Sequence, residues 1–213
     1  LFPLVVMGHL LGGFSLLTLL MIYRWQLSQQ HVRTLPVEAP SSATLSTQAT
    51  HPDAVSPALA RAGWLVLLIL LLQIALGGWT SANYAAMACA ELPVCQSGWS
   101  QQLNFSEAFD LHLGHHTYEY GVMSQSARAT VHVMHRVGAV ITLLVVAAYA
   151  ITLWRNSSGL MKNLAVAVLV LLLLQFSLGL ANVVLHLPLA NAVAHNFVAA
   201  NLVMCLVVIG YQL

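Results

Sequence analysis

The sequence predicts an all-α integral membrane protein with five transmembrane helices. Hydrophobic residues make up 59% of the 213 residues and charged residues only 6%, against roughly 45–50% and about 25% in an average soluble domain. So few charges cannot cover a water-facing surface, and we therefore expect the lipid bilayer to surround the chain. The 7 Lys and Arg nearly balance the 6 Asp and Glu, which argues against nucleic-acid binding.

Five apolar runs are long enough to cross the bilayer, which takes a helix of about 20 apolar residues. None of them contains Asp or Glu, and Arg136 is the one charged residue well inside a run. The strands of a membrane barrel would be shorter, about ten residues, and would alternate apolar with polar positions. The predicted helices are residues 3–23, 62–80, 130–153, 161–181 and 189–210.

The charges between the spans predict the orientation, because Lys and Arg concentrate in cytoplasmic connections. Connections 24–61 and 154–163 carry Lys and Arg, whereas 81–129 carries four acidic residues and a single Arg, and 182–188 carries no charge. We therefore expect a multi-pass membrane protein with 24–61 and 154–163 in the cytoplasm and 81–129 facing outward. In a bacterial inner membrane the outward side is the periplasm.

A polar segment separates the first span from the other four. Residues 28–61 begin with a stretch rich in Ser, Thr, Ala and Pro that has few apolar side chains. Such a composition is typical of a flexible linker. We expect three parts: residues 1–27, a cytoplasmic linker at 28–61, and a four-helix domain at 62–213.

An internal repeat relates the spans to one another. The pattern L-Q-x-x-L-G occurs at 72–77 and at 174–179, and each copy is followed by an outward connection and a helix with a histidine near its outer start. The first span fits the histidine-bearing half of this unit. Parallel repeats of this kind predict at least one helix before Leu1, and a whole further half. The alternative is a chance alignment of leucine-rich segments.

Three histidines lie at one depth of the predicted bilayer. His9, His135 and His195 are each five or six residues inside the outer end of a span, which places them roughly 8 Å below the surface at 1.5 Å per residue. A histidine inside a span is a candidate functional residue. The alternative for each one alone is a hydrogen bond between helices.

His135 and His195 form the stronger pair, because they occupy corresponding helices of the two repeats. Glycine and alanine near them leave room for a flat ligand. Two imidazoles on opposite helices suit the iron of a haem, ligated from both faces. Zinc fits less well, since it would need two further ligands and the spans offer no acid or thiolate at that depth.

Two neighbours of His135 carry their own alternatives. His132 lies on the same face and competes as a ligand, although His135 is deeper and in register with His195. Arg136 is a candidate partner for a haem propionate. Its alternative is an arginine that extends to the membrane surface.

The 81–129 connection holds a cysteine pair and a histidine cluster. Cys89 and Cys95 are predicted to form a disulfide if that side is oxidising, either redox-active or structural. His112, His115 and His116 resemble a metal patch, but we favour a solvated loop. We assign no role to His186, and we expect Cys205 in the last span to pack in the helix core.

Taken together, several segments resemble the heme A synthase family of cytochrome oxidase assembly proteins. The similarity covers nearly the whole chain outside residues 28–60. It is carried by three segments: Gly77-Gly78-Trp79-Thr80-Ser81-Ala82-Asn83-Tyr84 running into the cysteine pair, His132-Val133-Met134-His135-Arg136, and Ala181-Asn182-Val183-Val184 followed by Ala194-His195-Asn196.

The resemblance implies an eight-helix protein of two similar halves. The C-terminal half, here 62–213, would bind haem b through His135 and His195, and residues 1–27 would be the last helix of the N-terminal half. That half would oxidise the C8 methyl of its substrate haem O, through a hydroxymethyl stage, to the formyl group of haem A. His9 would ligate the substrate iron, and the synthase that supplies haem O is a candidate partner.

One feature departs from the family. Its catalytic half also supplies a glutamate and a second histidine from an earlier helix, whereas every acidic residue here lies in a connection. We therefore expect residues 1–213 alone to be inactive. A bis-histidine electron-relay subunit is the first alternative, and a small-molecule permease with parallel repeats is the second. The electron acceptor and a homo-oligomeric state are left open.

Overall fold

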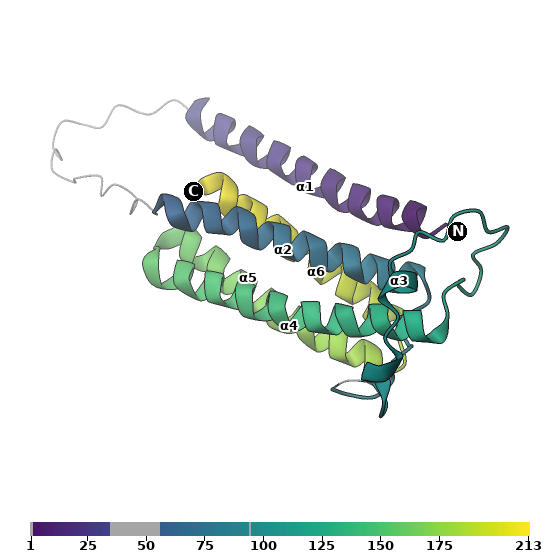
Figure 1. Ribbon diagram of the computed structural model, residues 1–213. Coiled ribbons are helices and arrows are strands. Elements are labelled where there is room, and N and C mark those ends of the chain that lie inside the picture. Colours follow the sequence, from purple (N-terminus) through teal and green to yellow (C-terminus); the bar gives the residue numbers. More distant parts are fainter. Residues whose placement is uncertain (1, 35–55, 94) are drawn as a thin grey trace, which may run out of the picture.

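The computed structural model describes residues 2–34, 56–93 and 95–213, and this part of the chain is helical without strands. Five helices in it are long and apolar enough to cross a membrane, which confirms the predicted fold class. They are α1 (Pro3–Thr34), α2 (Pro57–Ala82), α4 (Gln125–Asn156), α5 (Gly159–Val184) and α6 (Leu189–Gln212) (Figure 1).

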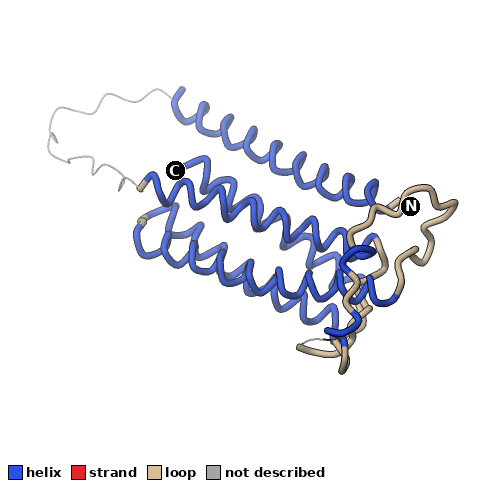
Figure 2. The backbone as a smooth tube through the Cα atoms, in the orientation of Figure 1, coloured by secondary structure: helices blue, strands red, loops and turns tan. Residues whose placement is uncertain are grey.

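The two short helices lie in the connection between α2 and α4. They are η1 (Trp99–Gln102) and α3 (Phe105–Ala108). Figure 2 shows the five long helices side by side, with most of the loops gathered at one end. We call this the α3 end, and the opposite end, where α1 stops and α2 begins, the linker end.

The helices next to the predicted linker are longer than expected. Residues 28–34 continue α1, and residues 57–61 form the first turn of α2, so helix extends into both ends of the predicted linker segment 28–61. The Ser56 hydroxyl accepts the N–H of Leu59 at 3.3 Å, and Pro57 occupies the first helical position, where its missing N–H costs nothing. The rest of the predicted linker, 35–55, lies outside the described residues.

Helix α4 also begins earlier than expected, at Gln125. Ser124 caps it by accepting the N–H of Ala127 at 3.3 Å. The additional turn contains polar residues, so the apolar run in the sequence does not include it. The long connection is therefore 83–124, and much of it packs on the start of α4.

Helices α2, α4, α5 and α6 form a four-helix bundle. Each packs against two others, in the cyclic order α2, α4, α5, α6, so that α4 and α6 lie diagonally opposite each other. Helix α1 lies outside this ring against α2 and α6. A Cβ at Gly78 would lie 3.0 Å from the Leu10 side chain, which shows how closely α1 approaches α2.

Buried side chains form one large apolar cluster and two smaller ones. A large apolar cluster fills its linker end and includes Val66, Val146, Leu153, Val168 and Leu202. A smaller cluster at the α3 end joins Trp79 and Val131 to residues of the 83–124 connection. His135 lies on α4 between Val131 of the smaller cluster and Val146 of the large one.

Candidate functional site

The first predicted ligand, His135, is held by a glutamine from the neighbouring helix. Gln73 on α2 places its Nε2 atom 3.0 Å from His135 Nδ1, and the same Nε2 donates to the backbone oxygen of His135 at 2.9 Å. Two contacts to one residue define both the position of the amide and the plane of the imidazole. The second ring nitrogen, Nε2, lies on the other side of the ring.

The second predicted ligand, His195, has the same kind of partner in the second repeat. Gln175 on α5 places its Nε2 atom 3.1 Å from His195 Nε2. The other ring nitrogen, Nδ1, and the Gln175 amide oxygen are buried without a hydrogen-bond partner among the described residues. Each imidazole thus uses one nitrogen for a glutamine and leaves the other available.

A glycine lies beneath each ring. A Cβ at Gly77 would lie 2.9 Å from His135 Cε1, and a Cβ at Gly179 would lie 3.3 Å from His195 Cε1. Both glycines are four residues after the glutamine and five before the end of their helix. The two histidine contacts therefore occur at matching levels of α2 and α5, as the repeat implies.

Sequence reasoning missed the glutamines. The pattern L-Q-x-x-L-G identified Gln73 and Gln175 as repeated positions, but it did not indicate which neighbour they contact. Their recurrence at one depth, in spans with almost no other polar side chain, was the available signal. A polar residue in such a span is expected to have a polar partner.

His9 is not brought together with the other two histidines. It lies on α1, which packs outside the ring, and its side chain is exposed. Its neighbours Met7 and Leu10 face Gly78 of α2, so His9 points away from that contact at about 100° per residue. A Cβ at Gly12, one turn further on, would meet no atom within 4 Å.

The side chain of His132 binds the long connection. It is buried, and its Nδ1 accepts the backbone N–H of Cys89 at 3.3 Å. The ring thus stabilises the segment that begins at the first cysteine. This contact gives His132 a structural role of its own, one turn before His135.

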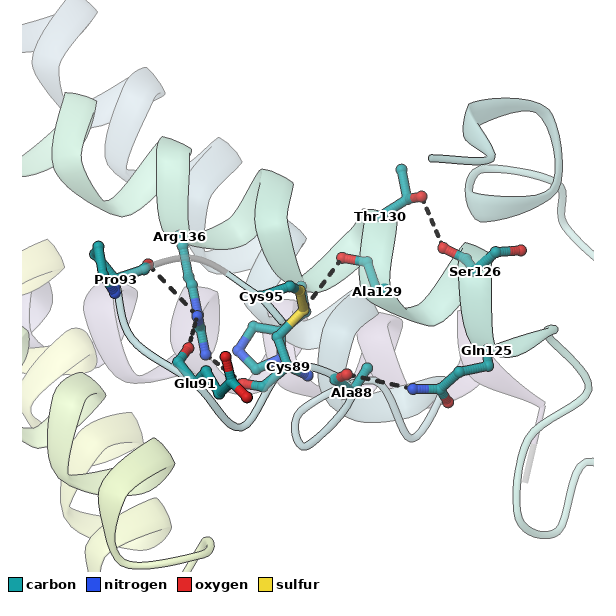
Figure 3. Close-up of a disulfide and its surroundings, with 11 residues drawn as sticks. Ala88, Cys89, Glu91, Pro93, Cys95, Gln125, Ser126, Ala129, Thr130 and Arg136 are labelled. Carbon is teal, nitrogen blue, oxygen red and sulfur yellow. Dashed lines mark hydrogen bonds between the residues drawn. A yellow bond between two sulfur atoms is a disulfide. The ribbon is translucent and has the colours of Figure 1, made fainter. Parts of the chain in front are cut away.

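Arg136 is directed to the same segment. Its guanidinium donates to the backbone oxygens of Cys89, of Glu91 at 2.7 Å and of Pro93 at 3.5 Å (Figure 3). The remaining donor, Nε, is buried without a partner among the described residues. A role toward a propionate stays a prediction.

Cys89 and Cys95 form a disulfide, as expected from the sequence, with their Cα atoms 4.7 Å apart. The bridge lies against α4, where Cys89 Sγ contacts the backbone oxygen of Ala129 at 3.8 Å (Figure 3). Both cysteines are buried with Val133. The disulfide therefore closes the part of the connection that His132 and Arg136 hold.

The remaining histidines have no metal-binding arrangement in the described part of the chain. His112 and His115 lie near one another, with ring centroids 6.3 Å apart, but no group of three His, Cys, Asp or Glu side chains there could hold an ion. His116 and His186 are exposed. Cys205 is a free, half-buried thiol in α6.

A carboxylate at the α3 end fastens α3 to the start of α4. Glu107 accepts the backbone N–H and the hydroxyl of Ser124, both at 2.6 Å, and the amide of Asn104 at 2.8 Å. The hydrogen bonds from Ser124 hold the pKa of Glu107 below its ordinary value of 4.5. Next to it, Trp79 Nε1 donates to the backbone oxygen of Ala108 at 2.8 Å.

The donor set at the centre of the bundle fits a planar iron cofactor. A metal-ligating histidine needs one free nitrogen and commonly donates the N–H of the other to an acceptor. His135 leaves Nε2 free and His195 leaves Nδ1 free, on helices that lie diagonally opposite, and glycines provide space beside both rings. The glutamine atom that faces each remaining nitrogen is the amide Nε2, which donates, so an iron-bound ring would need the amide oxygen turned toward it. With that rotation, His135 and His195 could hold the iron of a haem between them.

Comparison with known proteins identifies the family of the chain. The sequence profile described as "Cytochrome oxidase assembly protein", COX15-CtaA, matches residues 1–207. The "Heme A synthase" of Shewanella oneidensis is 44% identical over 216 residues, an alignment that covers all of this chain and 59% of that protein. The chain therefore belongs to the COX15-CtaA family of cytochrome oxidase assembly proteins.

Proposed function

We propose that residues 62–213 hold a haem b between His135 and His195, as the electron-transfer half of a heme A synthase. One observation carries this proposal: on both α2/α4 and α5/α6 a glutamine contacts a histidine ring that lies over a glycine, at Nδ1 of His135 and at Nε2 of His195. A structural hydrogen bond between helices would not need to occur twice at matching levels. The relative's name supports the same function.

The residues of the chain would have distinct tasks. His135 and His195 would bind the iron from its two faces, while Gly77 and Gly179 allow the rings to lie close to the neighbouring helices. Arg136, whose Nε lacks a partner among the described residues, would interact with a propionate. When bound, haem b would accept and release one electron at a time. The buried clusters would keep water from the iron.

We propose that the full-length protein oxidises the C8 methyl of haem O, through a hydroxymethyl stage, to the formyl group of haem A. His9 would bind the iron of this substrate, which agrees with its exposed side chain on the helix outside the ring. No spanning helix of the chain carries an Asp or Glu that could act as a base. Residues 1–213 alone would therefore bind haem b without converting haem O.

We further propose the orientation that the charges predict. The linker end would be cytoplasmic, and the α3 end with its disulfide would face the periplasm of a bacterial inner membrane. The oxidising periplasm favours the Cys89–Cys95 bridge. A haem O-producing enzyme in the same membrane is the proposed partner, because the apolar substrate would reach the protein through the bilayer.

The haem proposal is tested by absorption spectroscopy of the chain purified in detergent. We expect a low-spin haem b spectrum that is lost in His135→Ala and in His195→Ala. It should persist in His116→Ala, which removes an exposed histidine of the long connection. A protein without bound haem, or a low-spin spectrum that survives in both ligand variants, would show that the site is assigned wrongly.

An assay of haem O conversion by the full-length protein distinguishes an enzyme from an electron-relay subunit. Conversion of haem O to haem A, lost in His9→Ala while the haem b spectrum persists, supports the enzyme. Bound haem b with no conversion under reducing and oxidising conditions would favour a relay subunit.

A further inference from the structure

We infer that the short helix α3 lies in the lipid–water boundary, and that Phe105 and Phe109 contact the acyl chains of the leaflet at the α3 end. The partner is therefore a lipid surface. The inference concerns the 83–124 connection and does not depend on the haem site. It places part of a connection that hydropathy assigns to water inside the edge of the bilayer.

One stripe along α4 is exposed over most of the span. Val137, Ile141 and Leu144 are three and four residues apart, so they share a face, and about half or more of each side chain is exposed. The helix is long and apolar enough to cross a membrane, so this stripe faces lipid. The same spacing extends the stripe through Met134 to Thr130, near the start of the helix.

Helix α3 begins on the outer end of this stripe. Thr130 is completely buried, although it lies on the lipid-facing side of α4. The backbone N–H of Asn104 donates to Thr130 Oγ1 at 2.9 Å, and α3 starts at the next residue. The beginning of α3 therefore occupies the place that lipid occupies further along the stripe.

The contacts of α3 also define its depth. Thr130 is five residues after the first residue of α4, which is about 8 Å along the helix. Trp79, which donates to the backbone oxygen of Ala108 at 2.8 Å, comes three residues before the end of α2. Thus α3 lies beside the ends of both helices and not beyond them (Figure 1). Helices of the lipid–water boundary insert their apolar faces to a depth of about 5–10 Å.

The outward face of α3 is apolar. Phe105 begins the helix and Phe109 follows its last residue, so the two rings are one turn apart on one side. They are 50% and 47% exposed, which matches the 48% of the lipid-facing Val137. Glu107, the charged residue of α3, is directed inward, where it accepts the backbone N–H and the hydroxyl of Ser124.

The polar groups of α3 are paired as this depth requires. The side-chain oxygen of Asn104 accepts the N–H of Glu107 at 3.2 Å, and its backbone oxygen accepts the N–H of Ala108 at 3.0 Å. Unpaired backbone groups are costly where water is scarce. The cap at Asn104 and the Trp79 contact therefore allow α3 to lie against lipid.

Spin labelling of the full-length protein tests this position. The protein, carrying Cys205→Ala to remove the free thiol, is placed in nanodiscs of phosphatidylethanolamine and phosphatidylglycerol. A nitroxide is attached at Phe105→Cys or Phe109→Cys, and power saturation compares its access to oxygen, which concentrates among acyl chains, with access to a water-soluble nickel chelate. Ile141→Cys is the reference for lipid, and Glu119→Cys, at an exposed position of the same connection, is the reference for water.

We expect an oxygen-to-nickel ratio at both phenylalanine positions above that of Glu119→Cys and below that of the deeper Ile141→Cys. A ratio equal to that of Glu119→Cys would place α3 in water and overturn the inference. Low access to both reagents would mean that another protein segment covers the two rings, and would overturn it as well.

A pair of double variants tests the same face without a label. Phe105→Asp/Phe109→Asp places two charges at the edge of the acyl chains, so the unfolding midpoint in nanodiscs should fall. Phe105→Leu/Phe109→Leu keeps an apolar face and should stay near the parental midpoint. Equal midpoints for the two double variants would contradict contact with lipid, whatever the state of the haem site.

Discussion

The α2/α4 pair and the α5/α6 pair share their central contacts and differ at the α3 end. Both pairs place a glutamine beside a histidine over a glycine. The first pair is joined by residues 83–124, with a disulfide, a capped α3 and five side chains of α4 bound to the connection. The second is joined by residues 185–188 alone.

The short connection is stabilised in a simpler way. Asn191 near the start of α6 donates to the backbone oxygen of Leu178 at 2.9 Å and to the side-chain oxygen of Asn182 at 2.8 Å. No covalent link is needed for a connection this short. The comparison indicates that the histidine contacts depend on helix packing common to both pairs, whereas the disulfide and Arg136 serve the long connection. Four changes, in order of decreasing expected effect, test that separation.

The largest effect is expected where the two pairs differ inside the bundle. Three residues after His135 comes Gly138, whereas three residues after His195 comes the buried Val198. Gly138→Val would push the Gln73 amide away and leave His135 without its partner. We expect a loss of about 3 kcal/mol, from overpacking and a broken hydrogen bond. Thermal unfolding in detergent measures it.

The matched control for this change is Gly12→Ala, because a Cβ there meets no atom within 4 Å. It should leave the unfolding midpoint at or above the parental value, since alanine favours helix. Equal destabilisation by both substitutions would mean that Gly138 acts through helix propensity and not through contact with Gln73.

The sequence predicts the fold class and the disulfide, but it does not predict where the long helices end. Low charge and five apolar runs were sufficient for the fold class, and short spacing together with the outward orientation of the connection predicted the Cys89–Cys95 bridge. The helix ends were wrong because α1 and α4 continue past their apolar runs into polar residues, where hydropathy gives no signal. Ser124 and Ser56 are recognisable caps only once the following turn is known to be helical.

The partners of the histidines required knowledge of helix rotation. The repeat placed Gln73 and Gln175 at one level, but a period alone does not tell which neighbouring helix a side chain faces. Similarly, Arg136 was expected to extend to the membrane surface or to bind a propionate. Nothing in the sequence predicted that its guanidinium would donate to three backbone oxygens of residues 89–93.

Removing the disulfide should affect only the long connection. In Cys89→Ser/Cys95→Ser the unfolded chain gains the freedom of a short loop, which corresponds to about 2 kcal/mol. Limited proteolysis should then cleave within 83–124 faster, while hydrogen exchange at 185–188 stays unchanged. Cys205→Ala, which removes the free thiol, is the control. Faster exchange at both connections would show that the disulfide stabilises the whole bundle.

Arg136→Gln should have a smaller effect at the same place. It removes charged donors to three backbone oxygens, but the side chain is only half-buried, so we expect a loss of about 1 kcal/mol. Hydrogen exchange of residues 89–93 should rise. The equivalent position on α6 is the exposed Asn196, and Asn196→Gln should change nothing. A lost haem spectrum in Arg136→Gln with unchanged exchange would instead favour the propionate role.

The smallest effect is expected from pH, and again at one pair only. Hydrogen bonds from Ser124 lower the pKa of Glu107 in the folded protein. Its carboxylate therefore stabilises the α3 end at pH values above its ordinary pKa of 4.5. This contribution is lost as the pH falls through the lowered pKa. Hydrogen exchange of α3 and of the first turn of α4 should therefore rise below about pH 4.5.

Two variants identify the group responsible. Glu107→Gln should remove this pH dependence, because an amide does not titrate in that range. Glu119→Gln, at an exposed position of the same connection, should keep it. The 185–188 connection has no acidic residue, so its exchange should show no comparable acid step. An acid step at both connections would mean that the bundle itself loosens, and the assignment of the α3 end to Glu107 would then be wrong.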